Sequence, residues 1–96
     1  MNNKEIRSYK LDDINATGTF CRTDMPAGAK VINISYSSGS IFLHAIVKPK
    51  NSLKKRWFAI YMEGSKLEDY DKKTFDYVGM VNIVPTLHVF EVHDHE

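Results

Sequence analysis

The strongest β-hairpin signal in the chain lies between Ala29 and Val47, which read AKVINISYSSGSIFLHAIV. The first half of this stretch carries apolar side chains at alternate positions, which predicts a strand with one buried face: Ile32, Ile34 and Tyr36. Residues 37–40, Ser-Ser-Gly-Ser, are typical of a tight turn, because serine and glycine favour turn conformations. Residues 41–47 are apolar on both faces, which predicts a central strand.

Five further β-rich runs flank this hairpin: Ile6–Leu11, Thr19–Thr23, Trp57–Met62, Phe75–Val84 and Leu87–Val92. Turn signals separate them at 12–18, 25–28, 48–56 and 63–65, and the charged segment 66–74 is the one place where a helical turn is expected. Gly79, inside a β-rich run, indicates a bulge or a close backbone approach. The sequence therefore predicts a mainly β fold, a single small antiparallel β-barrel or sandwich of about seven short strands with at most one short helix.

The length, the net charge and the cysteine count limit the classes of protein to which the chain can belong. The chain has 96 residues, which predicts one domain over 1–96, with the ends 1–5 and 93–96 expected to be flexible. Thirteen Lys and Arg against twelve Asp and Glu give a net charge of +1, which removes the simplest argument for a nucleic-acid-binding protein. Cys21 is the one cysteine, so no intrachain disulfide forms, and the sequence shows neither a signal peptide nor a transmembrane run. We therefore expect a cytoplasmic protein without a membrane partner.

Histidines provide the first candidates for chemistry. Glu91, His93 and His95 would share one face of a strand, and imidazoles with a carboxylate suit zinc or iron. A frayed chain end does not hold ligands in place, so we predict a solvated tail and no metal or cofactor. His44 and His88 each stand between apolar residues, where a histidine is either a hydrogen-bonded, partly buried residue or a general base.

A basic segment precedes the single tryptophan. Lys48, Lys50, Lys54, Lys55 and Arg56 put five positive charges directly before Trp57 and Phe58. Basic charge beside exposed aromatic rings on a small β-fold is typical of proteins that bind single-stranded nucleic acid, and it also suits the phosphates of a nucleotide. A solvated loop followed by a core strand explains the same pattern. The basic segment and the acidic residues around 63–76 also suit the two complementary halves of a dimer surface.

A series of landmarks runs along nearly the whole chain, over about residues 6–92. They are Met25-Pro26-Ala27-Gly28-Ala29, Leu43-His44-Ala45-Ile46-Val47 with Pro49, Arg56 and Phe58 with Ile60-Tyr61 and Gly64, Tyr77-Val78-Gly79, and Leu87-His88-Val89-Phe90-Glu91. In order and spacing they resemble an uncharacterised small domain family of bacteriophages and prophages. The chain departs from that pattern at His44, where Trp is frequent, and at Met62-Glu63, where the family has a small-residue pair. The resemblance implies a small phage-encoded β-domain and no catalytic residues.

Three functions follow from these observations. The first is a non-catalytic phage accessory protein that acts in the host bacterial cytoplasm, countering host defence through contact with a host protein or capture of a small nucleotide-like ligand, as a homo-oligomer. Its expected contact residues are Lys54, Lys55, Arg56, Trp57, Tyr61, His44 and His88. The second is a single-stranded nucleic-acid-binding β-barrel that uses Arg56 and Trp57. The third is a small enzyme that depends on a metal or on Cys21 paired with a histidine.

Overall fold

The computed structural model describes residues 3–11, 19–67 and 74–93, which form seven β-strands. Their bounds are β1 Glu5–Leu11, β2 Thr19–Pro26, β3 Lys30–Ser37, β4 Ser40–Val47, β5 Leu53–Met62, β6 Thr74–Val81 and β7 Leu87–His93. The described residues contain no helix, which agrees with a mainly β fold. The helical turn expected at 66–74 falls largely outside the described residues.

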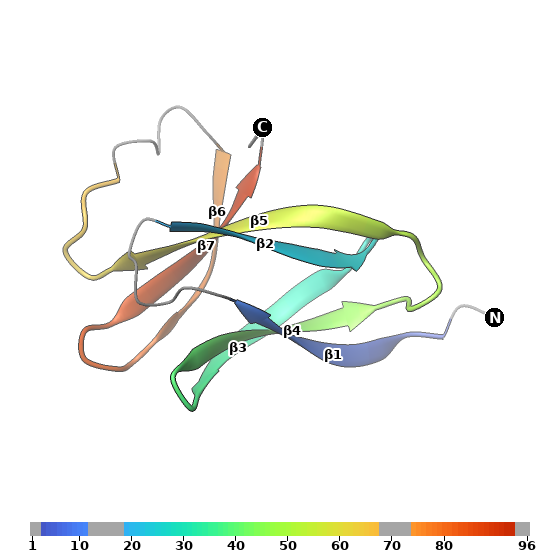
Figure 1. Cartoon of the computed structure of the whole chain (residues 1–96), viewed down its shortest axis with the longest axis horizontal. Coiled ribbons are helices and arrows are strands. Elements are labelled where there is room, and N and C mark those ends of the chain that lie inside the picture. Colours follow the sequence, from blue (N-terminus) through green and yellow to red (C-terminus); the bar gives the residue numbers. More distant parts are fainter. Residues whose placement is uncertain (1–2, 12–18, 68–73, 94–96) are drawn as a thin grey trace.

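The strands form two antiparallel sheets that face each other across the core (Figure 1). One sheet has three strands in the order β1-β4-β3, and the other has four in the order β2-β5-β7-β6. The sheets are not closed into a barrel, so of the two predicted architectures the structure is the sandwich. β4, predicted as a central strand, does lie in the middle of its sheet.

The β3–β4 hairpin confirms the strongest sequence signal and corrects one part of it. Ser38 and Gly39 form the turn with φ angles of 51° and 82°, the left-handed conformation that tight hairpins require. The alternation predicted for β3 fails at its start, because the register shifts between Val31 and Asn33. This bulge inserts Ile32 as an extra residue, so Ile32 is 46% exposed while Ile34 is buried. Tyr36, predicted on the same buried face, is 40% exposed near the end of this edge strand.

Three strand ends also differ from their predicted positions. β6 ends at Val81 and not at Val84, which is fully exposed. β5 begins at Leu53, so Lys54, Lys55 and Arg56 belong to the strand and not to the loop that the sequence indicated. β2 continues through Pro26, the residue expected to begin a turn. Proline is tolerated there because β2 is an edge strand and Pro26 is its last residue.

The main core fills the space between the two sheets. β4 contributes every second residue from Ile41 to Val47, and each of these side chains is at most 1% exposed. The facing sheet contributes Phe58 and Ile60 from β5 and Val89 from β7, all fully buried. Cys21 is buried in the same cluster. This alternation follows from the period of two along a strand, and it leaves the odd-numbered residues of β5 on the outer face of the four-stranded sheet.

Gly79 marks the place where β6 approaches the other sheet. The register of β6 on β7 shifts between Tyr77 and Gly79, as a bulge does, and a Cβ at Gly79 would lie 3.3 Å from Cγ1 of Ile34. Both alternatives that the sequence offered for this glycine, the bulge and the close approach, are therefore present. Through this contact the edge strands β3 and β6 close one side of the sandwich.

Candidate functional site: a pocket on the outer face of the four-stranded sheet

Aromatic side chains cover the outer face of the four-stranded sheet. We call them the outer aromatic cluster: Phe20, Trp57, Tyr61, Phe75, Tyr77 and Phe90. Neighbouring rings within it have centroids 5.3–6.3 Å apart, with four of the five ring pairs in edge-to-face geometry. The cluster is separate from the core between the sheets, because its members occupy the alternate positions of the same strands. The sheet therefore has two apolar faces.

A pocket of about 240 Å³ lies on this face where β5 ends. Its lining is Tyr61, Met62, Glu63, Gly64, Ser65, Leu67, His88 and Phe90. The turn that forms its rim is well anchored, because Ser65 N donates to Met62 O at 2.9 Å and Glu63 N donates to Thr86 O at 2.8 Å. Gly64 adopts a φ of 91° in this turn, which glycine allows without strain. Hence a rigid strand and a tight turn hold the polar rim above aromatic walls.

A chain of three polar side chains runs beside the pocket. The Tyr77 hydroxyl lies 2.8 Å from His88 Nδ1, and His88 Nε2 lies 2.6 Å from Glu63 Oε1. In the neutral ring with a proton on Nε2, Tyr77 donates to Nδ1 and Nε2 donates to Glu63, so both ring nitrogens are satisfied. His88 is 24% exposed and Glu63 is 69% exposed, which places the carboxylate at the mouth and the ring deeper. The histidine therefore fixes the orientation of the carboxylate at the rim.

His44, the other histidine singled out from the sequence, lies in the other sheet. It projects from the outer face of the three-stranded sheet, where its Nδ1 is 3.1 Å from the Ser8 hydroxyl and its Nε2 is 2.7 Å from the Ser35 hydroxyl. The three residues belong to β1, β4 and β3, so the histidine links all three strands of its sheet. His44 and His88 are thus both held by two side-chain hydrogen bonds, those of His88 reaching β6 and the turn after β5, but the structure does not bring the two histidines together.

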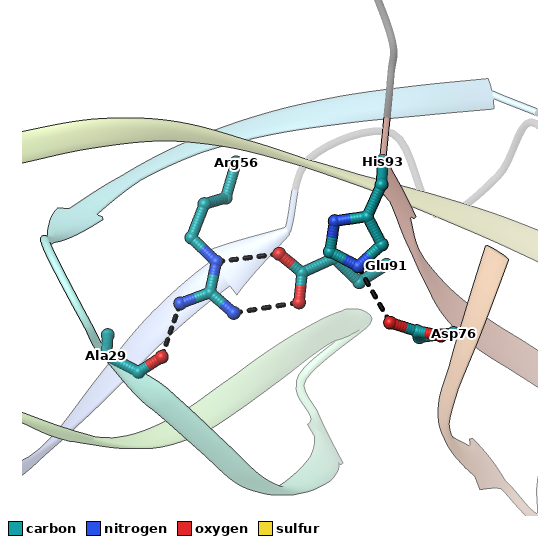
Figure 2. Close-up of polar contacts among 5 residues, drawn as sticks. All are labelled: Ala29, Arg56, Asp76, Glu91 and His93. Atoms are coloured by element: carbon teal, nitrogen blue, oxygen red, sulfur yellow. Dashed lines mark hydrogen bonds and ion pairs between the residues drawn. The ribbon is translucent and has the colours of Figure 1, made fainter. Parts of the chain in front are cut away.

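Arg56 points between the sheets and forms an ion pair there (Figure 2). Its Nε and Nη2 each donate to one oxygen of Glu91 at 2.7 Å, and its Nη1 donates to the carbonyl of Ala29 at 2.5 Å. The side chains of Arg56 and Glu91 are only 20% and 14% exposed. Arg56 therefore ties β5 and β7 to the residue just before β3, which is a structural role.

The remaining predicted contact residues divide between the two faces of β5. Trp57 lies on the outer face, in the outer aromatic cluster, and Lys55 is on the same face, opposite Asp24 of β2. Lys54 is exposed at the start of the strand. Of the seven residues predicted to make contacts, the structure brings together Tyr61 and His88, which face each other across β5 and β7 and both line the pocket.

Sequence reasoning missed several residues of the site. Glu63 and Ser65 were interpreted as a turn signal after the strand, and Leu67 as part of the segment expected to form a helical turn, while Tyr77 and Phe90 were not among the predicted contact residues. One signal for them existed in the sequence. His88 and Phe90 are two residues apart in one strand, so both side chains project from the same face of the sheet. Tyr61, which pairs with His88, and Tyr77, which pairs with Phe90, project from that face as well, so polar and aromatic groups gather there.

The carboxylate and imidazoles near the end of β7 are engaged with other side chains. Glu91 and His93 do share a face, as predicted, but Glu91 accepts from Arg56 and His93 Nε2 lies 2.7 Å from Asp76 Oδ2 (Figure 2). His95 lies outside the described residues. Within 3–11, 19–67 and 74–93, no group of three or more His, Cys, Asp or Glu side chains is placed to hold a metal ion.

Comparison with known proteins gives a family and no relative of known function. No curated protein and no solved structure matches the chain. Among the described residues, no helix is long and apolar enough to span a membrane. A family model described as a domain of unknown function, DUF7352, matches residues 2–96. The match covers every strand of the sandwich and every residue that lines the pocket, and the chain therefore belongs to the DUF7352 family.

Proposed function

We propose that the protein is a non-catalytic binding module that captures a small ligand in the outer-face pocket. The observation that carries this proposal is the convergence of aromatic walls, Tyr61 and Phe90, with a fixed polar rim, Glu63 and His88, in one concave site. Small-molecule sites are typically concave and largely apolar, with a few well-placed polar groups. The outer-face pocket has this composition.

Binding without turnover fits the site better than catalysis. Cys21, the candidate nucleophile, is buried between the sheets and belongs to the opposite face from the pocket. His88 is occupied on both ring nitrogens by Tyr77 and Glu63, so it positions the rim. A general base would need a nitrogen directed at the substrate.

A phage accessory role is one setting for such a module. The landmark residues that resemble bacteriophage and prophage domains include Tyr61, Gly64 and His88, which all line the pocket. A small protein that acts by stoichiometric capture would remove a signalling molecule or occupy a host factor without needing catalysis. In that setting the protein counters a host defence in the bacterial cytoplasm.

Replacing His88 with alanine tests the proposal, with His44→Ala as the matched control. Both histidines make two side-chain hydrogen bonds on an outer sheet face, but only His88 lines the pocket. We expect the wild-type protein and the His44→Ala variant, purified natively from bacterial cells, to release a small molecule on denaturation. The His88→Ala variant, purified in the same way, should carry no such molecule. Native and denaturing mass spectrometry measure this. A ligand retained equally by both variants would place the binding site elsewhere.

Nucleic-acid binding is a second candidate, favoured by a cluster of lysines at the opposite end of the sandwich. The turn after β2 meets the loop after β4 there, because Ala27 N donates to Ser52 O and Asn51 Nδ2 donates to Ala27 O, both at 2.8 Å. The lysines at this end are Lys4, Lys30, Lys48, Lys50 and Lys54. None of them forms an ion pair within the part of the chain that the structure describes, so their charge is available to phosphates.

The salt dependence of binding distinguishes this candidate. If the lysine end binds single-stranded DNA, the joint variant Lys48→Gln, Lys50→Gln, Lys54→Gln should lower the slope of log affinity against log salt by about 2, because each single-strand phosphate contact contributes about 0.7. Fluorescence anisotropy with a labelled oligonucleotide gives the slope. Lys66→Gln, just beyond the opposite end of β5, serves as the control. Equal slopes for wild type and the joint variant would eliminate this surface as a nucleic-acid site.

A further inference from the structure

We infer that the outer-face pocket selects a small organic cation, an alkylammonium or guanidinium group, over neutral and anionic ligands. This inference rests on the proposed function, because it names the chemical class of the ligand at the same site. Three features of the pocket carry it: the aromatic walls, the carboxylate at the rim, and the small volume.

The walls attract positive charge. Tyr61 and Phe90 line the pocket with their ring centroids 5.9 Å apart in edge-to-face geometry, so the two rings meet at an angle and form a corner. The face of an aromatic ring carries the negative part of its quadrupole and draws a cation placed over it. Met62 and Leu67 complete the apolar lining, which reduces the screening of that attraction by water.

The rim supplies a carboxylate with an unused oxygen. Glu63 Oε1 interacts with His88, and the other carboxylate oxygen makes no hydrogen bond within the described residues. His88 thus holds the carboxylate in place and leaves one oxygen to accept from an N–H donor of the ligand. Among the described residues, the pocket lining contains no lysine or arginine, and Lys66, between two lining residues, is exposed. An anionic ligand would therefore meet the negative charge of Glu63, with no lysine or arginine of the described lining to offset it.

The volume limits the size of the group that enters. At about 240 Å³ the pocket is smaller than the roughly 300–1,000 Å³ that is usual for sites of drug-sized ligands. A chain of a few carbon atoms that ends in an ammonium or guanidinium group suits this space. Phosphates near Glu63 would be repelled by its carboxylate, so the inferred cation differs from the nucleotide-like ligand expected from the sequence.

A matched series of probes tests the inference. Butylammonium, butylguanidinium, butanol and butyrate share one alkyl chain and differ in the charge and hydrogen-bonding capacity of the head group. Ligand-detected NMR titration of the wild-type protein should show binding in the order cation, then alcohol, then carboxylate. The variant Glu63→Gln should weaken butylammonium by about 10-fold and leave butanol unchanged, since it removes a charged hydrogen-bond acceptor whose effect solvent screening reduces at an exposed rim. Glu5→Gln, an exposed carboxylate on β1, is the control and should change neither.

A free amine and the basic side chain of a partner protein both present such a cation. An acetylated and amidated Gly-Lys-Gly peptide distinguishes the two. Tighter binding of the peptide than of butylammonium indicates the basic side chain of a partner protein, and the reverse indicates a free amine. Butyrate binding as well as butylammonium, or a Glu63→Gln variant that binds butylammonium unchanged, would overturn the inference. A neutral or anionic ligand that co-purifies with wild type and is lost from His88→Ala would overturn it while leaving the proposed function intact.

Discussion

Replacing Phe58 with alanine should lower the free energy of unfolding by about 3–5 kcal/mol, the range for truncating a fully buried phenylalanine. Phe58 is 0% exposed and is the largest of the fully buried side chains in the described core. It projects from β5, which is paired on both sides, so the backbone around the lost ring has little freedom to collapse. The cavity therefore stays open, and its cost adds to the loss of apolar burial.

Urea unfolding followed by circular dichroism measures the change. Phe42→Ala is the matched control, because Phe42 is only half-buried, on the outer face of the central strand of the other sheet. Phe58→Ala should be clearly the more destabilising of the two. Equal losses would mean that the space between the sheets is not the main core.

Replacing Arg56 with methionine should destabilise the fold by about 2–4 kcal/mol, because it leaves the carboxylate of Glu91 largely buried without its partner. The pair is bidentate and both side chains are mostly buried. The variant also removes the hydrogen bond from Nη1 to the carbonyl of Ala29, which joins the two sheets. Methionine keeps the unbranched apolar stem, so the loss reports on the charge and hydrogen bonds and not on packing.

A second substitution separates the mechanism from simple disruption. Adding Glu91→Met to Arg56→Met should recover part of the lost stability, since replacing both partners removes the unpaired charge. Arg22→Met is the control, because Arg22 and Asp24 are 3.6 Å apart and about half exposed, and such pairs contribute little. A double variant that is less stable than Arg56→Met alone would contradict this explanation.

The sequence predicted the strands well because period-two patterning determines which face is buried. The apolar side chains on both faces of residues 41–47 identified the central strand of the three-stranded sheet, and the Ser-Gly turn located the hairpin. The same pattern cannot reveal an inserted residue, so Ile32 was assigned to the buried face and is instead exposed at a bulge. Bulges depend on pairing with the neighbouring strand, and that information is not local.

The candidate site was only partly predictable for a similar reason. Tyr61 and His88 were each singled out, but their contact depends on the register of β5 on β7, which the sequence does not encode locally. Arg56 and Trp57 show the opposite case. They were treated as one basic and aromatic surface because the segment was interpreted as a loop, whereas adjacent residues of a strand project to opposite faces. Placing the start of β5 correctly would have separated them.

The measurement that most directly tests the central claim is a map of amide chemical shifts from ¹H–¹⁵N NMR spectra recorded as each of the four butyl compounds is added. If the outer-face pocket is the binding site, at least one compound should shift residues 61–67 and 88–90 and leave the strands around His44 unchanged. Shifts that gather on the three-stranded sheet, or no specific shifts with any compound, would contradict the assignment of the outer-face pocket as the functional site.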